Sequence, residues 1–269
     1  MNRVNIDHTN NNKQKRSPMK QKEYIVGWQP VLALCHALRQ NISLTVTPEL
    51  LWVTKAGWAE KGGTLRVLIE RGVVVHQVDH ANQVPQDVRQ YFNVQGVVCA
   101  AVSCPKEIHE DDWLMHRCVM VCDGVQDPQN LGSLCRLACA MGVGALVLPK
   151  HNQVPITAVV RRVAQGAAER LPIVVVNNLV RWLQDRKKQG FWVYGTSERG
   201  QMPLDQVQFD APNTILVVGS EGKGMRRLVN DACDVVMCIA TEKDFQSLNV
   251  VQAASMLTYE YHRQQGSQS

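Results

Sequence analysis

The sequence predicts an α/β fold in two parts, a larger C-terminal domain on a mostly parallel sheet and a small N-terminal α/β domain. Three observations lead to this prediction. Apolar runs of strand length recur from residue 118 onward, and helical patterns separate them. A shorter alternation of the same kind spans about residues 23–102. The segment 103–117 between the two is charged and irregular, which fits a linker better than a core element.

The smaller domain is predicted from a few short patterns. In chain order these are a helix over 30–40, a strand over 50–53, a helix over 65–71, a strand over 73–78 and an apolar run over 97–102. The first helix carries Val31, Leu34, Cys35 and Leu38 on one face. We expect Gly72 to cap the second helix, because glycine is the residue that most readily ends a helix.

A basic segment precedes this domain. Residues 1–22 hold six Lys or Arg residues against one Asp, and they contribute much of the net charge of +5. Their composition is polar and poor in apolar residues, so we expect disorder. A solubilising tail and an arm that touches RNA both fit this pattern, because a mild basic balance favours nucleic acid only weakly.

The C-terminal domain, residues 118–269, is predicted from six apolar strands that alternate with helices. The strands are expected at 118–122, 145–148, 173–176, 191–194, 215–218 and 235–239. A last helix is expected over about 248–263, and its buried stripe consists of Val250, Ala253, Ala254, Leu257 and Tyr261. Such alternation indicates a mostly parallel sheet with helices on both faces.

Other features of the chain exclude several protein classes. No apolar run has the length of a membrane-spanning helix, and the first residues lack a secretory signal, so we expect a cytoplasmic protein. The nine cysteines should then be reduced thiols. Neither the pair Cys118 and Cys122 nor the pair Cys135 and Cys139 has zinc-knuckle spacing, so we expect buried packing and no metal.

Three polar, glycine-rich segments follow or precede the predicted strands of the larger domain. The first, residues 123–136 (DGVQDPQNLGSLCR), follows a strand and opens a helix. Asn130 lies where a helix N-cap is expected, and simple capping is the plainest interpretation. Arg136 lies off the apolar face of that helix, either as a surface arginine or as a contact for a phosphate.

The second segment, residues 218–225 (VGSEGKGM), follows the strand over 215–218. It has neither the spacing of a phosphate-cradling P-loop nor the glycine order of a dinucleotide fingerprint. Three glycines in six residues still indicate a tight backbone or close approach to a ligand. Glu221 is then either an exposed carboxylate or a ligand contact.

The third segment, residues 247–250 (SLNV), precedes the last helix. Ser247 could cap that helix, and Asn249 could be a polar residue of its first turn. Each segment alone is a weak signal. Ligand sites in parallel sheets lie at the carboxyl ends of strands, so all three are expected to converge.

Together these residues closely resemble the three signature motifs of the SpoU/TrmH family in the SPOUT superfamily of RNA methyltransferases, over about residues 118–263. Within the family they look most like the RlmB-type 23S rRNA guanosine 2′-O-methyltransferases. The resemblance implies a deep trefoil knot, S-adenosylmethionine as cofactor, an RNA substrate and a homodimer whose interface completes the active site. It also implies that the smaller domain binds RNA.

The resemblance assigns roles position by position. It implies that the cofactor is held by the loops around Gly219, Ile239 and Leu248. The functional polar residues of the family correspond to Asn130, Arg136, Glu221, Ser247 and Asn249. Four segments depart from the family pattern: residues 28–30 read Trp-Gln-Pro, 94–96 Val-Gln-Gly, 239–241 Ile-Ala-Thr and 250–253 Val-Val-Gln-Ala.

The implied reaction needs a ribose hydroxyl lined up behind a methyl carbon and helped to lose its proton. Arg136 is the family's candidate for this activation, and an arginine that stays protonated suits an electrostatic role better than that of a base. Three alternatives stay open: a non-catalytic RNA-binding protein on the same fold, an NAD-type enzyme, and a methyltransferase for tRNA. The missing glycine fingerprint counts against the NAD enzyme.

Overall fold

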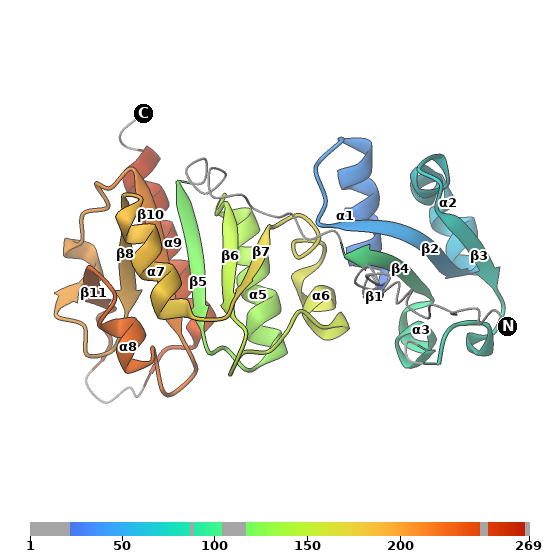
Figure 1. The fold of residues 1–269 in the computed structure, drawn as a ribbon. Helices are drawn as coiled ribbons and strands as arrows, with labels where there is room; N and C mark the ends of the chain where they lie inside the picture. Colours follow the sequence, from blue (N-terminus) through green and yellow to red (C-terminus); the bar gives the residue numbers. More distant parts are fainter. Residues whose placement is uncertain (1–21, 87–88, 104–116, 243–246, 267–269) are drawn as a thin grey trace, which may run out of the picture.

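The structure, a computed structural model, describes residues 22–86, 89–103, 117–242 and 247–266. Two sheets lie side by side along the molecule, one formed before residue 104 and one after residue 116 (Figure 1). We call them the N-terminal unit (residues 22–103) and the C-terminal unit (residues 117–266). Residues 1–21 of the predicted basic tail and most of the predicted linker lie outside the described residues, whereas Lys22, also assigned to the tail, begins a strand. In the part that is described, no helix is long and apolar enough to cross a membrane.

The sheet of the C-terminal unit has seven strands, and every neighbouring pair that is recorded is parallel. In spatial order these strands are β7 (Ile173–Val176), β6 (Ala145–Pro149), β5 (Cys118–Asp123), β10 (Asn213–Gly219), β8 (Phe191–Thr196), β11 (Val235–Cys238) and β9 (Met202–Pro203). The mostly parallel sheet predicted from the sequence is therefore confirmed. All six predicted strands are present, and the short β9 was not predicted.

Helices cover both faces of this sheet. They are α5 (Pro128–Ala140), α6 (Ala158–Ala164), α7 (Leu179–Lys188), α8 (Arg227–Asn230) and α9 (Val250–Gly266), and a 3-10 turn, η2, spans Leu204–Gln206. Met120 and Cys122 of β5 pack with α5, α6 and α9, whereas Val119 and Val121 pack with α7 and α8. This alternation follows from the two-residue period of a strand, and it explains why each strand is apolar throughout.

The N-terminal unit has a mixed four-stranded sheet. Its strands, in spatial order, are β1 (Lys22–Val26), β4 (Val97–Ser103), β2 (Val46–Thr54) and β3 (Val74–Val78). Its helices are α1 (Trp28–Arg39), α2 (Lys55–Glu70), the 3-10 turn η1 (Ala81–Gln83) and α3 (Arg89–Gln95). Helices α1 and α2 cover one face, while η1 and α3 lie on the side of Val26, Trp52 and Val98.

Helix α2 corrects the sequence prediction, which placed only residues 65–71 in a helix. The observed helix begins ten residues earlier, where Thr54 Oγ1 caps it by accepting a hydrogen bond from the Gly57 N–H. Glycines disfavour a helix, so this stretch gave a weak signal. Gly57 is needed because a Cβ there would lie 2.5 Å from the Trp28 ring. The predicted stop is confirmed, since Gly72 follows the helix with φ of +82°.

The two units meet at helix α6 and the turn that follows it. The Thr45 N–H donates a 2.8 Å hydrogen bond to the carbonyl of Glu169. Gly166 approaches so closely that a Cβ there would lie 2.2 Å from the Ala33 side chain. Next to this contact, Arg161 and Glu169 form a buried ion pair at 2.9 Å. Close backbone packing therefore joins the units, and the buried pair stabilises the C-terminal side of this contact.

Candidate active site

The carboxyl edge of the seven-stranded sheet holds a cavity of about 550 Å³. Four chain segments line it: residues 196–199 after β8, 219–225 after β10, 239–242 after β11, and 247–248 before α9. Gly219, Glu221, Ile239, Ser247 and Leu248 are among the lining residues. Five of the eight residues singled out from the sequence therefore border one cavity.

The loop after β10 explains its three glycines. The Ser220 N–H donates to the Gly224 carbonyl at 3.0 Å, and the Gly224 N–H donates back to the Ser220 carbonyl at 2.9 Å. Gly222 and Gly224 have φ of +72° and +66°, a region that glycine adopts easily. At Gly219 a Cβ would lie 2.1 Å from the Gly224 carbonyl carbon. The loop thus folds back onto its own start and presents backbone to the cavity.

Hydrogen bonds between side chains join the three polar segments at the edge of this cavity. Asn130 Nδ2 donates to Glu221 Oε1 at 2.6 Å. Asn249 Nδ2 donates to Asn130 Oδ1 at 3.2 Å. The partners are 91 and 119 residues apart in the chain, so only the fold brings them together. Glu221 is an exposed carboxylate that accepts a hydrogen bond from Asn130, and its contact with a ligand stays a prediction.

The ends of the two helices that carry these asparagines correct two predictions. Asn130 is not the N-cap of α5: Asp127 is, and its Oδ1 accepts from the Gln129 N–H at 2.8 Å ahead of Pro128. Ser247 does not cap α9, which begins only at Val250. Asn249 Oδ1 accepts from the Val251 N–H at 2.8 Å instead. Asn249 therefore both caps α9 and reaches Asn130.

Arg136 lies on the exposed side of α5, as the sequence predicted. Leu131, Leu134, Cys135 and Ala138 of the same helix are buried. Six helical residues separate Arg136 from Asn130, a rise of about 9 Å along the axis. Within the described residues, Arg136 is not among those that line the cavity. Arg136 is therefore an exposed residue of α5 outside the lining of the cavity.

A buried carboxylate anchors the loop after β10. Asp123, the last residue of β5, is 1% exposed. Its Oδ2 accepts from the Arg226 N–H at 2.8 Å, and its Oδ1 accepts from Arg226 Nε at 2.7 Å. The sequence did not point to this pair, because nothing in the spacing of two residues 103 positions apart indicates contact.

The sequence analysis also missed the cavity segment after β8. Thr196, Ser197, Glu198 and Arg199 line the cavity. The signal that identified the other loops was present here too, since a polar run follows the apolar strand. Glu198 and Arg199 bring charges of both signs to the rim, which suits a ligand with an amino group and a carboxylate.

The cysteines pack as apolar side chains. Cys118, Cys122 and Cys135 belong to the core between the sheet and α5, and Cys139 packs against that core. Burial raises the pKa of the Cys118 and Cys135 thiols to about 12. Among the described residues, no three His, Cys, Asp or Glu side chains are placed to hold a metal ion.

Comparison with known proteins gives the family. Residues 117–259 match the SpoU rRNA methylase family, which is more than half of the chain. The chain belongs to the SpoU rRNA methylase family. The three hydrogen-bonded polar segments thus all lie within the part of the chain that matches the family.

Several bacteria have named proteins that are similar in sequence to this chain. A 23S rRNA (guanosine-2′-O-)-methyltransferase RlmB of Xanthomonas campestris pv. campestris is 44% identical over 146 residues, 54% of this chain. An RlmB of Ralstonia nicotianae is 38% identical over 174 residues, 63% of this chain. The matches span 58% and 70% of those two proteins.

Solved SpoU structures share the fold over nearly the whole chain. The SpoU methyltransferase AviRb from Streptomyces viridochromogenes, crystallised with AdoMet, superposes with a TM-score of 0.69 at 23% identity and covers 91% of both chains. At this identity the likeness shows the fold alone, for both units together.

Proposed function

We propose that this chain transfers a methyl group from S-adenosylmethionine to a ribose 2′-hydroxyl of RNA, at a guanosine of 23S rRNA. The observation that carries the proposal is the hydrogen-bonded chain Asn249–Asn130–Glu221 beside a cavity bounded by Gly219, Ile239 and Leu248. Membership of the SpoU family supports the methyl transfer. The RlmB relatives support the rRNA guanosine.

The cavity fits the proposed cofactor. Its volume of about 550 Å³ lies within the range of small-ligand clefts. Gly219, Ile239 and Leu248 would hold the adenine and methionine parts through their backbones, and the absence of side chains at Gly222 and Gly224 keeps the approach open. When bound, S-adenosylmethionine supplies a methyl carbon made electrophilic by its sulfonium.

The polar side chains would position the ribose. Asn130 is held on both sides by Glu221 and Asn249, so its amide cannot rotate without breaking a hydrogen bond. Ser247 lines the same cavity and can direct its hydroxyl toward a sugar oxygen. A fixed orientation of nucleophile and methyl carbon contributes much of the rate in such transfers.

Arg136 would activate the hydroxyl electrostatically. A guanidinium stays protonated, so it does not accept the hydroxyl proton. It can bind the adjacent phosphate and lower the free energy of the developing alkoxide. Because Arg136 is exposed and does not line the cavity of its own protomer, we propose a homodimer in which it serves the site at the shared interface.

The remaining assignments belong to the same proposal. The N-terminal unit would bind RNA, the C-terminal unit would contain a trefoil knot, and an rRNA substrate would place the protein in the cytoplasm. The 2′-hydroxyl distinguishes RNA from DNA, so DNA should not be methylated.

The decisive experiment is transfer of tritiated methyl groups to an unmodified 23S rRNA transcript, followed by mapping of the labelled nucleotide. We expect Arg136→Ala to abolish incorporation while isothermal titration still detects S-adenosylmethionine binding. Arg170→Ala is the matched control, because Arg170 is an exposed arginine at the opposite edge of the sheet, shortly before β7. An active Arg136→Ala enzyme would refute its role, and label found only in tRNA would refute the rRNA assignment.

A further inference from the structure

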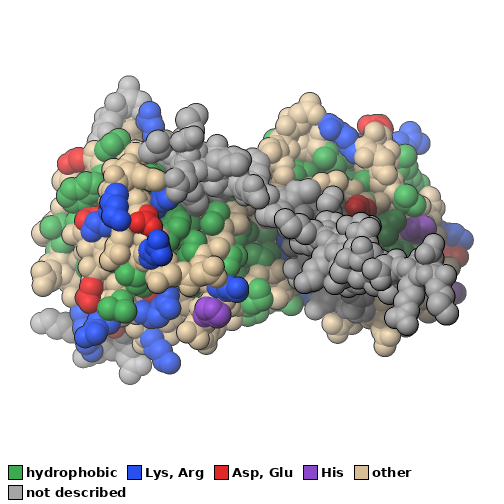
Figure 2. Space-filling view, viewed as in Figure 1, with side chains coloured by type: hydrophobic (Ala, Val, Ile, Leu, Met, Phe, Trp, Pro, Cys, Tyr) green, Lys and Arg blue, Asp and Glu red, His purple; other side chains and the backbone are tan. Residues whose placement is uncertain are grey.

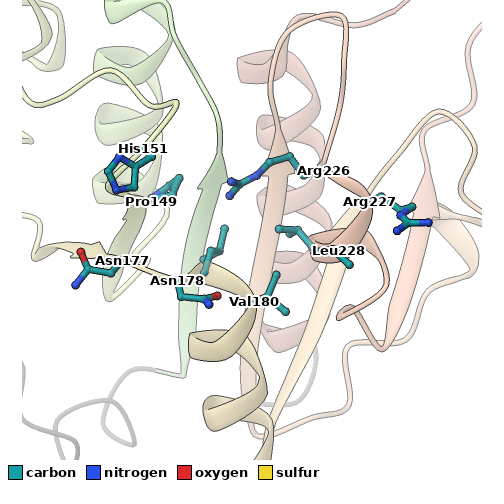
Figure 3. A pocket seen from close by; sticks show the side chains of 10 residues that line it. Pro149, His151, Asn177, Asn178, Val180, Arg226, Arg227 and Leu228 are labelled. Atoms are coloured by element: carbon teal, nitrogen blue, oxygen red, sulfur yellow. The ribbon is translucent and has the colours of Figure 1, made fainter.

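A second cavity lies beside the proposed active site. Its volume is about 350 Å³, and it lies between the end of β6, the start of α7 and residues 226–229 (Figure 3). Residues 219–225 line the first cavity and residues 226–229 line the second. One loop therefore forms a wall of both, and a strand of RNA with its target ribose in the first would pass the second.

The second cavity has an apolar floor. Leu228 lies beside Val180 in Figure 3, and Pro149 and Leu179 also line the space. Leu228 is 59% exposed, so its side chain is accessible to a ligand in this cavity. A phosphate gains nothing from such a surface, whereas the flat face of a nucleobase does.

Two planar polar side chains, those of Arg226 and His151, also line the cavity. Arg226 is held by Asp123, and in Figure 3 its guanidinium points toward Pro149 and His151. A guanidinium held in one orientation, and an imidazole, are surfaces on which bases stack. Asn178 uses its Oδ1 to cap α7 at 3.0 Å, which leaves its Nδ2 to donate to a base edge.

The charge around the cavity suits nucleic acid. Its ten lining residues include two arginines and one histidine and no carboxylate. Figure 2 shows many Lys and Arg side chains, with some Asp and Glu side chains among them, on the face of the C-terminal unit that carries α7 and α8. Arg227 points away from the cavity in Figure 3, so it lies on the rim, where a phosphate adjoining the bound base would pass.

We propose that this second cavity holds an unpaired base of the RNA strand that carries the target ribose. The inference rests on the proposed function for the identity of the partner. It adds a base-binding site built from Leu228, Val180, His151 and Arg226, outside the methyl-transfer cavity. The enzyme would thereby select single-stranded RNA over duplex at a position next to the methylated nucleotide.

The first test is RNA binding without methyl transfer. Fluorescence anisotropy is measured with a labelled single-stranded RNA dodecamer of mixed sequence and with the same sequence as a duplex. We expect Leu228→Ala and His151→Ala each to weaken single-strand binding about tenfold, since base contacts of this kind are worth ~1–3 kcal/mol. Trp192→Ala is the control, because it removes an apolar side chain that is 50% exposed on β8. Thermal melting of each variant checks the fold.

A salt series separates base contacts from phosphate contacts. Leu228→Ala should leave the slope of log Kd against log salt unchanged, because it removes no ionic contact. Arg227→Gln should reduce that slope by about one, as expected for loss of one phosphate contact. Equal losses for single strand and duplex in Leu228→Ala would overturn the proposal, as would wild-type binding by both Leu228→Ala and His151→Ala.

Methylation kinetics distinguish this inference from the proposed function. With the 23S rRNA transcript, Leu228→Ala should raise KM for RNA about tenfold. Most of the decrease in kcat/KM should come from this rise in KM and the smaller part from kcat. A wild-type enzyme that transfers no methyl group to any RNA would refute the proposed function. The RNA-binding assay would then test the base-binding cavity by itself. A wild-type enzyme that methylates, beside a Leu228→Ala variant with unaltered KM, would refute the cavity's role alone.

Discussion

Exchanging the roles of Asn130 and Glu221 tests whether the hydrogen-bonded chain is what the active site needs. In the structure, Asn130 donates to Glu221 at 2.6 Å and accepts from Asn249 at 3.2 Å. Asn130→Asp alone would place a second carboxylate against Glu221. In the double variant with Glu221→Gln, the new glutamine amide can donate to the new aspartate, and Asn249 can still donate to it. Both hydrogen bonds are then retained with donor and acceptor exchanged.

The magnitude follows from the exposure of the pair. Two unit charges about 4 Å apart repel by about 1 kcal/mol in water and about 4 kcal/mol near a protein surface. Glu221 is exposed, so the lower figure is the relevant one. Loss of a hydrogen bond to a charged group adds about 1 kcal/mol after allowance for solvent. Asn130→Asp should therefore destabilise the hydrogen-bonded chain Asn249–Asn130–Glu221 by about 2 kcal/mol, or ~30-fold.

The assay is kcat for methyl incorporation into the 23S rRNA transcript, with the free energy of unfolding in urea measured in parallel. We expect Asn130→Asp to lower kcat about 30-fold and the double variant to recover at least tenfold of that loss. Asn213→Asp is the control, since it adds the same charge at the start of β10, at the opposite edge of the sheet. If the kcat of the double variant is no higher than that of Asn130→Asp, then Glu221 does not contribute to activity through its hydrogen bond to residue 130.

Three further predictions test the cavity loop, the thiols and the junction of the units. Gly219→Ala should abolish S-adenosylmethionine binding in isothermal titration, because its Cβ would lie 2.1 Å from backbone of the same loop and would push the loop open. Burial raises the pKa of Cys118 and Cys135 to about 12, so at pH 8 their thiols stay protonated. Mass spectrometry should find them unlabelled by iodoacetamide in the folded chain and labelled in urea; labelling of the folded chain at pH 8 would contradict this. Arg161→Leu should destabilise the chain by ~3–5 kcal/mol in urea unfolding, because it leaves Glu169 charged and buried, and adding Glu169→Leu should restore most of the loss.

The strands and their parallel order could be predicted because the information is local. The central strands β5, β6 and β10 are buried on both faces, so an apolar run in the sequence indicates each of them directly. Helix α2 shows the opposite case. Gly57 is required by the Trp28 ring, which lies 29 positions earlier, and no local pattern in the sequence reports that contact. Its first ten residues therefore looked unlike a helix.

The site divides in the same way. Convergence of the polar segments followed from one rule, that the carboxyl ends of parallel strands share an edge. The helix caps were assigned wrongly at Asn130 and Ser247, because Asn, Asp and Ser compete for caps and the sequence does not show which residue wins. The hydrogen bonds from Asn130 to its partners depend on orientations that only the assembled loops define. The residues were predicted, and their geometry was not.

The second cavity could not have been predicted, and its origin shows how the fold links binding to chemistry. Asp123 ends the strand that leads into the first polar segment, and its buried carboxylate holds Arg226 by backbone and side chain. Arg226 is the point at which the loop leaves the first cavity and enters the second. Because Arg226 is bound to the end of β5, both halves of the loop begin at a point that is fixed to the sheet. The backbone proposed to cradle the methyl donor and the leucine proposed to hold a base are therefore positioned from one shared anchor.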